Sequence, residues 1–144
     1  MTVIVHTYTS AALGSVMYAI TNSWQAAVAT FISGVFIDID HIFDFLVFSG
    51  ERYSIQNFNS WCYEMRWTKI TLIFHSYELF ILLGFIAYYT RSKATLGILC
   101  GAVIHVLLDQ FSNLKYFKLS PWFYFITYRA IKGFKKDNMR DFTV

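Results

Sequence analysis

Residues 36–44 read Phe36-Ile37-Asp38-Ile39-Asp40-His41-Ile42-Phe43-Asp44. They place three carboxylates and one imidazole inside an otherwise apolar segment that runs from about residue 24 to residue 48. Helix formation does not call for ionisable groups there, and each such group costs roughly a few kcal/mol at membrane depth. An ionisable residue in an apolar segment is a candidate functional residue, so we expect this stretch to form one wall of a site.

The composition is typical of an integral membrane protein. Of the 144 residues, 56% are hydrophobic and 20% aromatic but only 15% are charged, which is too apolar for a soluble protein of this size. The first residues have no basic region and no cleavage site of a secretory signal, so we expect the first apolar segment to be retained. Cys62 and Cys100 are not spaced as a CxxC motif and predict neither a disulfide framework nor a zinc knuckle.

Four segments are long enough to cross or nearly cross a bilayer, about residues 3–20, 24–48, 70–89 and 95–111. Short polar links join the first to the second and the third to the fourth, so each pair is expected to form an antiparallel hairpin. The loop at 49–69 should lie on the bilayer surface, and the tail at 114–144 should be interfacial. The predicted fold is a single all-α membrane domain over residues 1–144, a four-helix transmembrane bundle with an interfacial C-terminal helix.

The basic residues are unevenly distributed along the chain. With a cytoplasmic N-terminus, the loop places three Lys or Arg residues inside and the tail seven, against Arg91 and Lys93 outside. The positive-inside rule therefore predicts that both termini and the site face the cytoplasm. The same basic rim would also suit an anionic substrate. The basic tail indicates contact with a membrane surface, and no nucleic-acid partner is expected.

On this topology the ionisable residues meet near one end of the bundle. Antiparallel helices alternate in direction, so early positions in the first and third helices share a depth with late positions in the second and fourth. At 3.6 residues per turn, each helix also presents its ionisable residues on one face. The residues of this layer are His6, Asp38, Asp40, His41, Asp44, His75, Glu78, His105 and Asp109. Gly97 and Gly101, on the stripe of His105, would let two helices approach closely.

Imidazoles and carboxylates together in a dry pocket typically bind a divalent metal. Zinc suits these donors at roughly 2.0 to 2.2 Å, and manganese or iron is possible. The donors exceed what one ion needs, so we expect one or two ions. A two-metal site activates water and clamps the reacting oxygens, as phosphoesterases do. The candidate catalytic carboxylates, as general bases or groups that orient a histidine, are Asp38, Asp40, Asp44 and Glu78. For Asp44 and Glu78, a structural contact with Arg66 or Lys69 is the alternative.

Several short motifs, taken in order, resemble a known family. They are His6 with Gly14, Gly34-xxx-Asp38-Ile39-Asp40-His41, His75-Ser76 and Gly101-xxx-His105-xxx-Asp109. Over about residues 6–113 the chain resembles the small bacterial inner-membrane proteins described as predicted membrane-bound metal-dependent hydrolases. That family is similar in motif order to the zinc phospholipases C and the single-strand-specific zinc nucleases. Ile37 stands where the family usually has proline, and Leu72-Ile73-Phe74 where it usually has a basic-glycine turn.

The resemblance implies a location in the bacterial inner membrane and hydrolysis of a phosphoester in a lipid or lipid-linked molecule. It also implies a set of functional, metal-binding residues, namely His6, Asp38, Asp40, His41, His75, His105 and Asp109. The expected partners are the lipid bilayer and a lipid-like or phosphate-bearing substrate, with Arg66, Lys69 or Lys115 as phosphate contacts. A homo-oligomer is compatible with the sequence.

Two other functions use a similar polar layer. A membrane di-iron oxidoreductase acting on acyl chains would carry repeated Glu-xx-His pairs or closely paired histidines, and the chain has neither. A cation or proton conduit would distribute ionisable groups through the full membrane thickness, whereas residues 26–36 and 80–87 are almost wholly apolar. We therefore expect a metal-dependent hydrolase.

Overall fold

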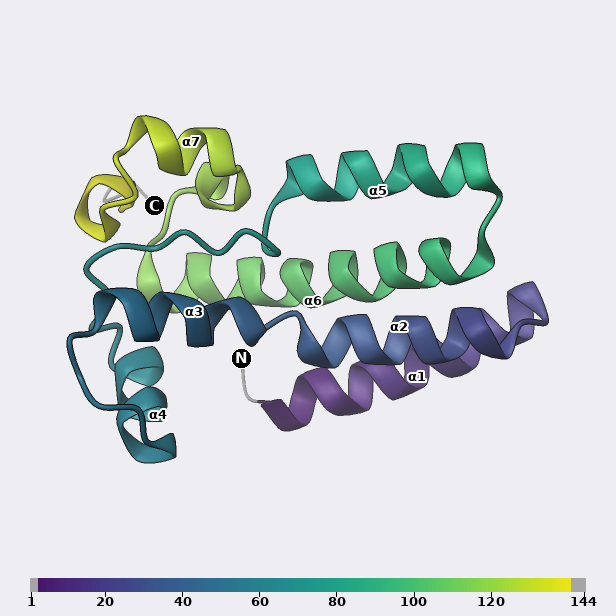
Figure 1. Cartoon of the computed structure of the whole chain (residues 1–144), viewed down its shortest axis with the longest axis horizontal. Coiled ribbons are helices and arrows are strands. Elements are labelled where there is room, and N and C mark those ends of the chain that lie inside the picture. Colours follow the sequence, from purple (N-terminus) through teal and green to yellow (C-terminus); the bar gives the residue numbers. More distant parts are fainter. Residues whose placement is uncertain (1–2, 141–144) are drawn as a thin grey trace.

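The computed structural model describes residues 3–140, and its regular structure is helical, as predicted. Four long helices run along the long axis of the molecule (Figure 1). They are α1 (Val3–Thr21), α2 (Trp24–Phe36), α5 (Tyr77–Thr90) and α6 (Lys93–Phe117). α1 pairs with α2, and α5 with α6, so both expected hairpins are present.

Each hairpin turn is closed by a left-handed residue followed by a serine cap. Asn22 has a φ of 47° and Arg91 a φ of 53°, and both lie at the end of a helix. Ser23 then accepts a hydrogen bond from the N–H of Ala26, and Ser92 from that of Thr95. A capping hydroxyl satisfies one of the free N–H groups at a helix start, so two residues suffice to reverse the chain.

Small residues bring α2 and α6 into close contact. A Cβ atom at Gly97 would collide with the carbonyl group of Ala26, and one at Gly101 with the carbonyl oxygen of Thr30. A Cβ at Gly34 would collide with the hydroxyl of Ser10 in α1. The close approach predicted from Gly97 and Gly101 is therefore confirmed; it fixes α6 against α2, and Gly34 brings α2 against α1.

The segment expected as one helix over residues 24–48 is instead two helices. α2 ends at Phe36, Ile37 and Asp38 form a turn, and α3 (Ile39–Phe48) follows it (Figure 1). No Pro or Gly stands at this break. Two carboxylates of α3 lie against an extended segment of the chain and accept hydrogen bonds from its N–H groups.

That extended segment is the second departure from the expected helices. Helix α5 begins only at Tyr77, after the capping residue Ser76, so residues 70–76 are not helical. Side chains from α3 and a carbonyl from the C-terminal region satisfy N–H groups that a helix would have paired internally. The N–H groups of Thr71 and Leu72 donate hydrogen bonds to the Asp44 carboxylate, and that of Phe74 donates to the Asp40 carboxylate. The N–H group of Ile70 donates to the carbonyl oxygen of Phe134.

The remaining elements cover the end of the bundle where α3 lies. The loop at 49–69 contains α4 (Ile55–Tyr63), which packs Phe58 and Trp61 edge-on against Phe45 with ring centroids 5.7 and 5.5 Å apart. After α6 come the short helices η1 (Pro121–Tyr124), α7 (Ile126–Ile131) and η2 (Lys136–Met139). The expected C-terminal helix is thus only the short α7, and the first residues of the 114–144 tail belong to α6.

Among the described helices, α6 alone is long and apolar enough to cross a bilayer, and one third of its most apolar stretch is buried. Four spans were expected. The break at Ile37 shortens α2 to 13 residues, and the late start of α5 leaves 14, whereas a bilayer core needs about 20. α1 has 19 residues, but hydroxyl-bearing residues such as Thr7 and Ser10 lower its hydropathy.

Candidate metal centre

Three segments supply the candidate site: the turn between α2 and α3, the extended segment before α5, and the second half of α6. The start of α1 adds a fourth. The four imidazoles lie close together there. The His6 and His105 ring centroids are 3.9 Å apart, those of His105 and His75 5.4 Å, and those of His75 and His41 5.0 Å. The histidines that the sequence placed in one layer are therefore in contact.

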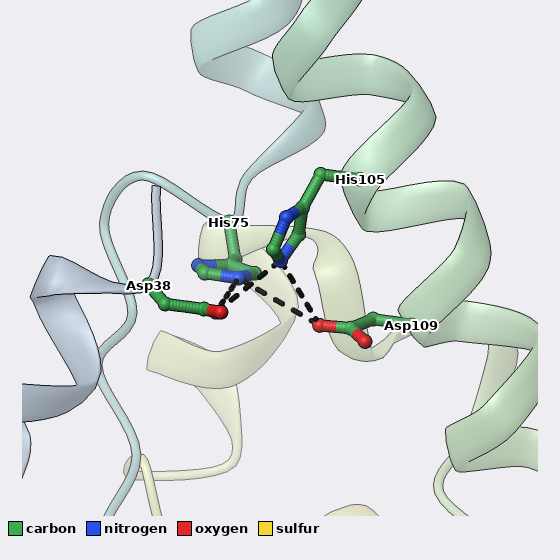
Figure 2. Close-up of side chains that lie close together, drawn as sticks. All are labelled: Asp38, His75, His105 and Asp109. Atoms are coloured by element: carbon green, nitrogen blue, oxygen red, sulfur yellow. Dashed lines mark ion pairs between the residues drawn. The ribbon is translucent and has the colours of Figure 1, made fainter. Parts of the chain in front are cut away.

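At the centre lie Asp38, His75, His105 and Asp109, which we call the four-residue cluster (Figure 2). Asp38 Oδ1 lies 3.3 Å from His75 Nε2 and 3.2 Å from His105 Nε2. Asp109 Oδ2 lies 3.3 Å from His105 Nε2 and 3.9 Å from His75 Nε2. The side chains come from three different segments and point toward one another.

These distances fit a small divalent cation. Four donors about 2.0 to 2.1 Å from a central ion, arranged as a tetrahedron, are separated from one another by about 3.3 to 3.4 Å. Three of the four distances given above are 3.2 or 3.3 Å. In addition, the Nε2 atoms of His75 and His105 are buried and lack a hydrogen-bond partner. Two nitrogens and two carboxylate oxygens form a donor set that suits zinc.

His105 is held in the orientation that a metal ligand needs. Its Nδ1 lies 2.8 Å from the Gly34 carbonyl oxygen, which can only accept a hydrogen bond. The proton therefore sits on Nδ1, and Nε2 turns its lone pair toward the four-residue cluster. A backbone carbonyl behind a ligating histidine is a usual way to fix its tautomer.

His75 is oriented by a carboxylate instead. Its Nδ1 lies 3.1 Å from Asp40, which also accepts a hydrogen bond from the N–H of Phe74 at 2.9 Å. Asp40 was expected to be a metal ligand. It instead contacts His75 at Nδ1, whereas His75 faces the four-residue cluster through Nε2. Asp40, His41 and His75 do form a second group with donor atoms within 4.8 Å of one another. An ion bound there would have to share His75.

His6 supports the opposite side of the cluster. Its Nε2 lies 3.1 Å from Asp109 Oδ1, while Asp109 Oδ2 faces His105. The His6 ring stacks on the His105 ring with an interplanar angle of 17°. His6 therefore positions a ligand oxygen and packs a ligand ring, although the sequence suggested that it would bind the ion directly.

Asp38 and His41 are the more accessible members of the site. The Asp38 side chain is 36% exposed and that of His41 15%, against at most 1% for His75 and His105. His41 Nε2 lies 3.6 Å from Asp38 Oδ1, and its ring packs on Trp67. Substrate or water would therefore meet these two residues first.

Two of the expected catalytic carboxylates have other partners. Asp44 accepts hydrogen bonds from the N–H groups of Thr71 and Leu72 and from the Thr71 hydroxyl. Glu78 accepts hydrogen bonds from the N–H groups of Ile126 and Thr127, and so joins α5 to α7. The structure does not bring either of them into the four-residue cluster, and neither contacts Arg66 or Lys69 through an ion pair.

The buried residue Arg129 was not among the site residues expected from the sequence. Its guanidinium donates hydrogen bonds to the carbonyl oxygens of Leu72, His75 and Phe123, at 2.9, 3.1 and 3.1 Å. Burial lowers its pKa to about 10, so it stays protonated at neutral pH. We expected this part of the tail to be interfacial. A lone arginine among the apolar residues 123–131 was the available signal, but surface and buried arginines look alike in a sequence.

A cavity of about 740 Å³ adjoins the site. His6, Asp38, His41, His75 and Asp109 line its polar end, and apolar or aromatic side chains form most of the remaining wall. Small-molecule sites have volumes of about 300 to 1,000 Å³. Burial raises the pKa of the nearby Cys62 thiol to about 12, so at neutral pH it is not a thiolate that would compete for the metal.

No described Lys or Arg lines this cavity. Arg66, one of the expected phosphate contacts, pairs with Glu51 at 2.6 Å and Glu64 at 3.3 Å. Lys69 pairs through its backbone with Lys135, and the Lys115 ammonium lies over the Tyr116 ring. The expectation that these cations contact a phosphate at the site therefore finds no support in the structure.

Comparisons of the chain with protein-family models, with curated proteins and with solved structures give no match, so the function has to be argued from the geometry of the site.

Proposed function

We propose that the protein is a membrane-bound metal-dependent hydrolase that cleaves a phosphoester in a lipid or lipid-linked substrate. The observation that carries this proposal is the four-residue cluster, whose donor atoms have the spacing of a tetrahedral zinc site and lie at the polar end of an apolar cavity. We further propose that the ion is zinc and that one ion binds per chain.

The four residues of the cluster differ in how exposed they are. His75, His105 and Asp109 are buried, at 1, 1 and 8% exposure, whereas Asp38 faces the cavity. Catalytic zinc sites typically have three protein ligands and one position open to water or substrate. We infer that the three buried residues hold the ion and that Asp38 occupies the side from which water enters.

A divalent ion held there would lower the pKa of a water molecule and polarise a phosphoryl oxygen. Asp38 is placed to accept the proton of the attacking water, since its side chain is the most exposed of the four. His41 Nε2, 3.6 Å from Asp38 Oδ1, is placed to form an ion pair with the same carboxylate when protonated. Three further contacts orient the residues that hold the ion: His6 contacts Asp109, Asp40 contacts His75, and the Gly34 carbonyl contacts His105.

Membrane insertion is supported by the outward faces of the long helices. Large apolar side chains are exposed there, among them Val28 and Ile32 on α2 and Leu82 and Phe85 on α5. Residues 1–37 contain no Asp, Glu, Lys or Arg. Soluble monomers rarely expose contiguous apolar patches larger than roughly a few hundred Å². We propose an inner-membrane location with the site on the cytoplasmic side, and the protein should remain in membranes washed with alkaline carbonate.

Metal analysis of purified protein tests the proposal. The wild type should contain at least one divalent ion per chain and hydrolyse lipid phosphoesters. His105→Ala should lose both the ion and the activity, and Asp38→Asn should keep the ion but lose the activity. Glu78→Gln is the matched control, because Glu78 contacts α7 and not the cluster. Less than one ion per wild-type chain would rule out the proposed metal centre.

A further inference from the structure

We infer that the cavity beside the four-residue cluster binds a hydrocarbon chain of the substrate, with the reacting head group at the cluster. This inference rests on the proposed function, because it assigns the rest of the substrate to the space next to the catalytic residues. The substrate is then an amphiphile with an uncharged, apolar chain.

The lining of the cavity is mostly apolar. The titratable groups that line it are gathered at the cluster, apart from Cys62 and the tyrosines, and Asn59, Ser112 and Asn113 add neutral polar groups. Much of the remaining wall consists of side chains such as Phe58, Trp67, Leu72 and Phe123. Trp67, Leu72 and Phe123 are nearly fully buried, so their positions are fixed by packing. Burying a hydrocarbon chain against such a wall gains about 0.8 kcal/mol per CH₂ group.

Most of the exposed residues that line the cavity are apolar or aromatic. Val5, Phe36, Ile39, Tyr63 and Tyr116 line the cavity and are themselves exposed, Phe36 by 61% and Tyr116 by 69%. Asn59 adds an exposed amide. The apolar side chains suit entry from the hydrocarbon region of a membrane, where exposed apolar groups are not penalised.

The absence of Lys and Arg from the described lining limits the head group. A polyanionic soluble substrate would need cationic side chains to offset its charge. Here the only compensation for a negative charge would be at the metal centre. The geometry therefore favours a lipid whose charge is confined to the reacting group, and it disfavours soluble phosphate compounds.

Photolabelling tests this inference with the protein in lipid nanodiscs. The probe is a long-chain alkyl phosphate with a diazirine at the end of its chain, and mass spectrometry maps the labelled residues. Label is expected on α4 and on the 67–72 segment, above the background on the outward face of α5. Cys62→Trp adds a large side chain to the cavity wall and should abolish this label. Ile55→Trp adds the same side chain on the outer face of α4, where Ile55 is 73% exposed, and should leave the label unchanged. If Cys62→Trp does not fold, Cys62→Phe gives the same test.

The metal separates this inference from the proposed function. Protein stripped of metal by a chelator should still be labelled, because chain binding depends on the apolar wall. Restoring zinc should then raise labelling by the alkyl phosphate but not by the alcohol of the same chain length. Equal labelling of wild type and both cavity-filling variants would overturn the inference, as would equal labelling by the two probes in protein that has bound zinc. Cavity labelling without any metal binding would overturn the hydrolase proposal, but it would still support binding of a hydrocarbon chain in the cavity.

Discussion

Asp38, Asp40 and Asp44 lie close together in the sequence, but each has a different set of partners. Asp38 faces His75 and His105 at the cavity, Asp40 holds His75 from behind, and Asp44 accepts hydrogen bonds from the extended segment. Their local sequence is nearly the same, an acidic residue among apolar ones. Asp38 lies in the turn at residues 37–38 whereas Asp40 and Asp44 lie in α3, so the three carboxylates face different segments.

The role of Asp40 gives a first prediction. Asp40→Asn should weaken zinc binding by about 10- to 100-fold without abolishing it, since outer-shell partners of ligating histidines have effects of that size. Competition with a chromophoric zinc chelator would measure the change. His75→Ala is the reference for a lost ligand. A loss as complete in Asp40→Asn as in His75→Ala would mean that Asp40 itself binds the ion.

A second prediction concerns Arg129. Arg129→Met should lower the free energy of unfolding by about 3 kcal/mol, because the carbonyl groups of Leu72, His75 and Phe123 would be left without their donor in a buried setting. The loosened segment should also bind zinc more weakly. Thermal unfolding and zinc titration would measure the two effects.

Arg91→Met is the control for Arg129→Met. Arg91 is exposed and stacks over the Tyr88 ring at 5.0 Å, so its replacement should change stability by less than about 0.5 kcal/mol. Equal effects of the two substitutions would contradict a specific role for the buried guanidinium.

At the level of elements, the contact between α2 and α6 sets the geometry of the site. Thr30 and Gly34 of α2 meet Gly101 of α6 backbone to backbone. His105, one turn after Gly101, then reaches the Gly34 carbonyl. The helix contact and the orientation of a proposed ligand are therefore the same structural feature.

Substitutions of two glycines test this contact. Gly101→Ala should destabilise the protein by about 1 to 3 kcal/mol, because its Cβ would meet the Thr30 carbonyl and overpack the contact. Gly84→Ala in α5 should instead stabilise it by up to about 1 kcal/mol, since its Cβ would find only ordinary contact with Leu99. Thermal unfolding of the purified variants would measure both. Equal shifts for the two variants would contradict close packing at Gly101.

The helical elements were predicted from the sequence more reliably than their ends. Hydrophobic length and short polar links predicted both hairpins. The break at Ile37 and the late start of α5 could not be predicted, because neither place has a Pro or Gly. The break and the late start both depend on contacts between residues distant in the sequence. Asp40 and Asp44 accept hydrogen bonds from the N–H groups of Thr71, Leu72 and Phe74.

On the scale of the whole molecule, a bound ion would join the segment before α5 to α6. His75 lies in that segment, whereas His105 and Asp109 lie on α6. Zinc at 100 times its dissociation constant should raise the free energy of unfolding by about 2.7 kcal/mol. Thermal unfolding with and without a chelator would measure this gain. His105→Ala should not respond to either treatment, and an equal response in that variant would contradict the assigned site.

The convergence of the candidate site could be predicted from topology alone. Alternating helix directions placed the four histidines at one end, and the structure has them there. Which carboxylates would join them could not be predicted. Glu78 and Asp44 differ from Asp109 and Asp38 only in the partners that the fold supplies, and those partners lie in other segments.

The separation of Arg129 from Leu72 and His75 along the sequence has a consequence for the order of biosynthesis. Leu72 and His75 leave the ribosome long before the residue that donates hydrogen bonds to their carbonyl groups, and Ile70 likewise leaves it long before Phe134. Both hairpins can form while translation continues, but the His75 segment acquires these bonds only after residues 129–134 have been made. A nascent or C-terminally truncated chain would therefore carry every proposed ligand and still lack a rigid metal centre.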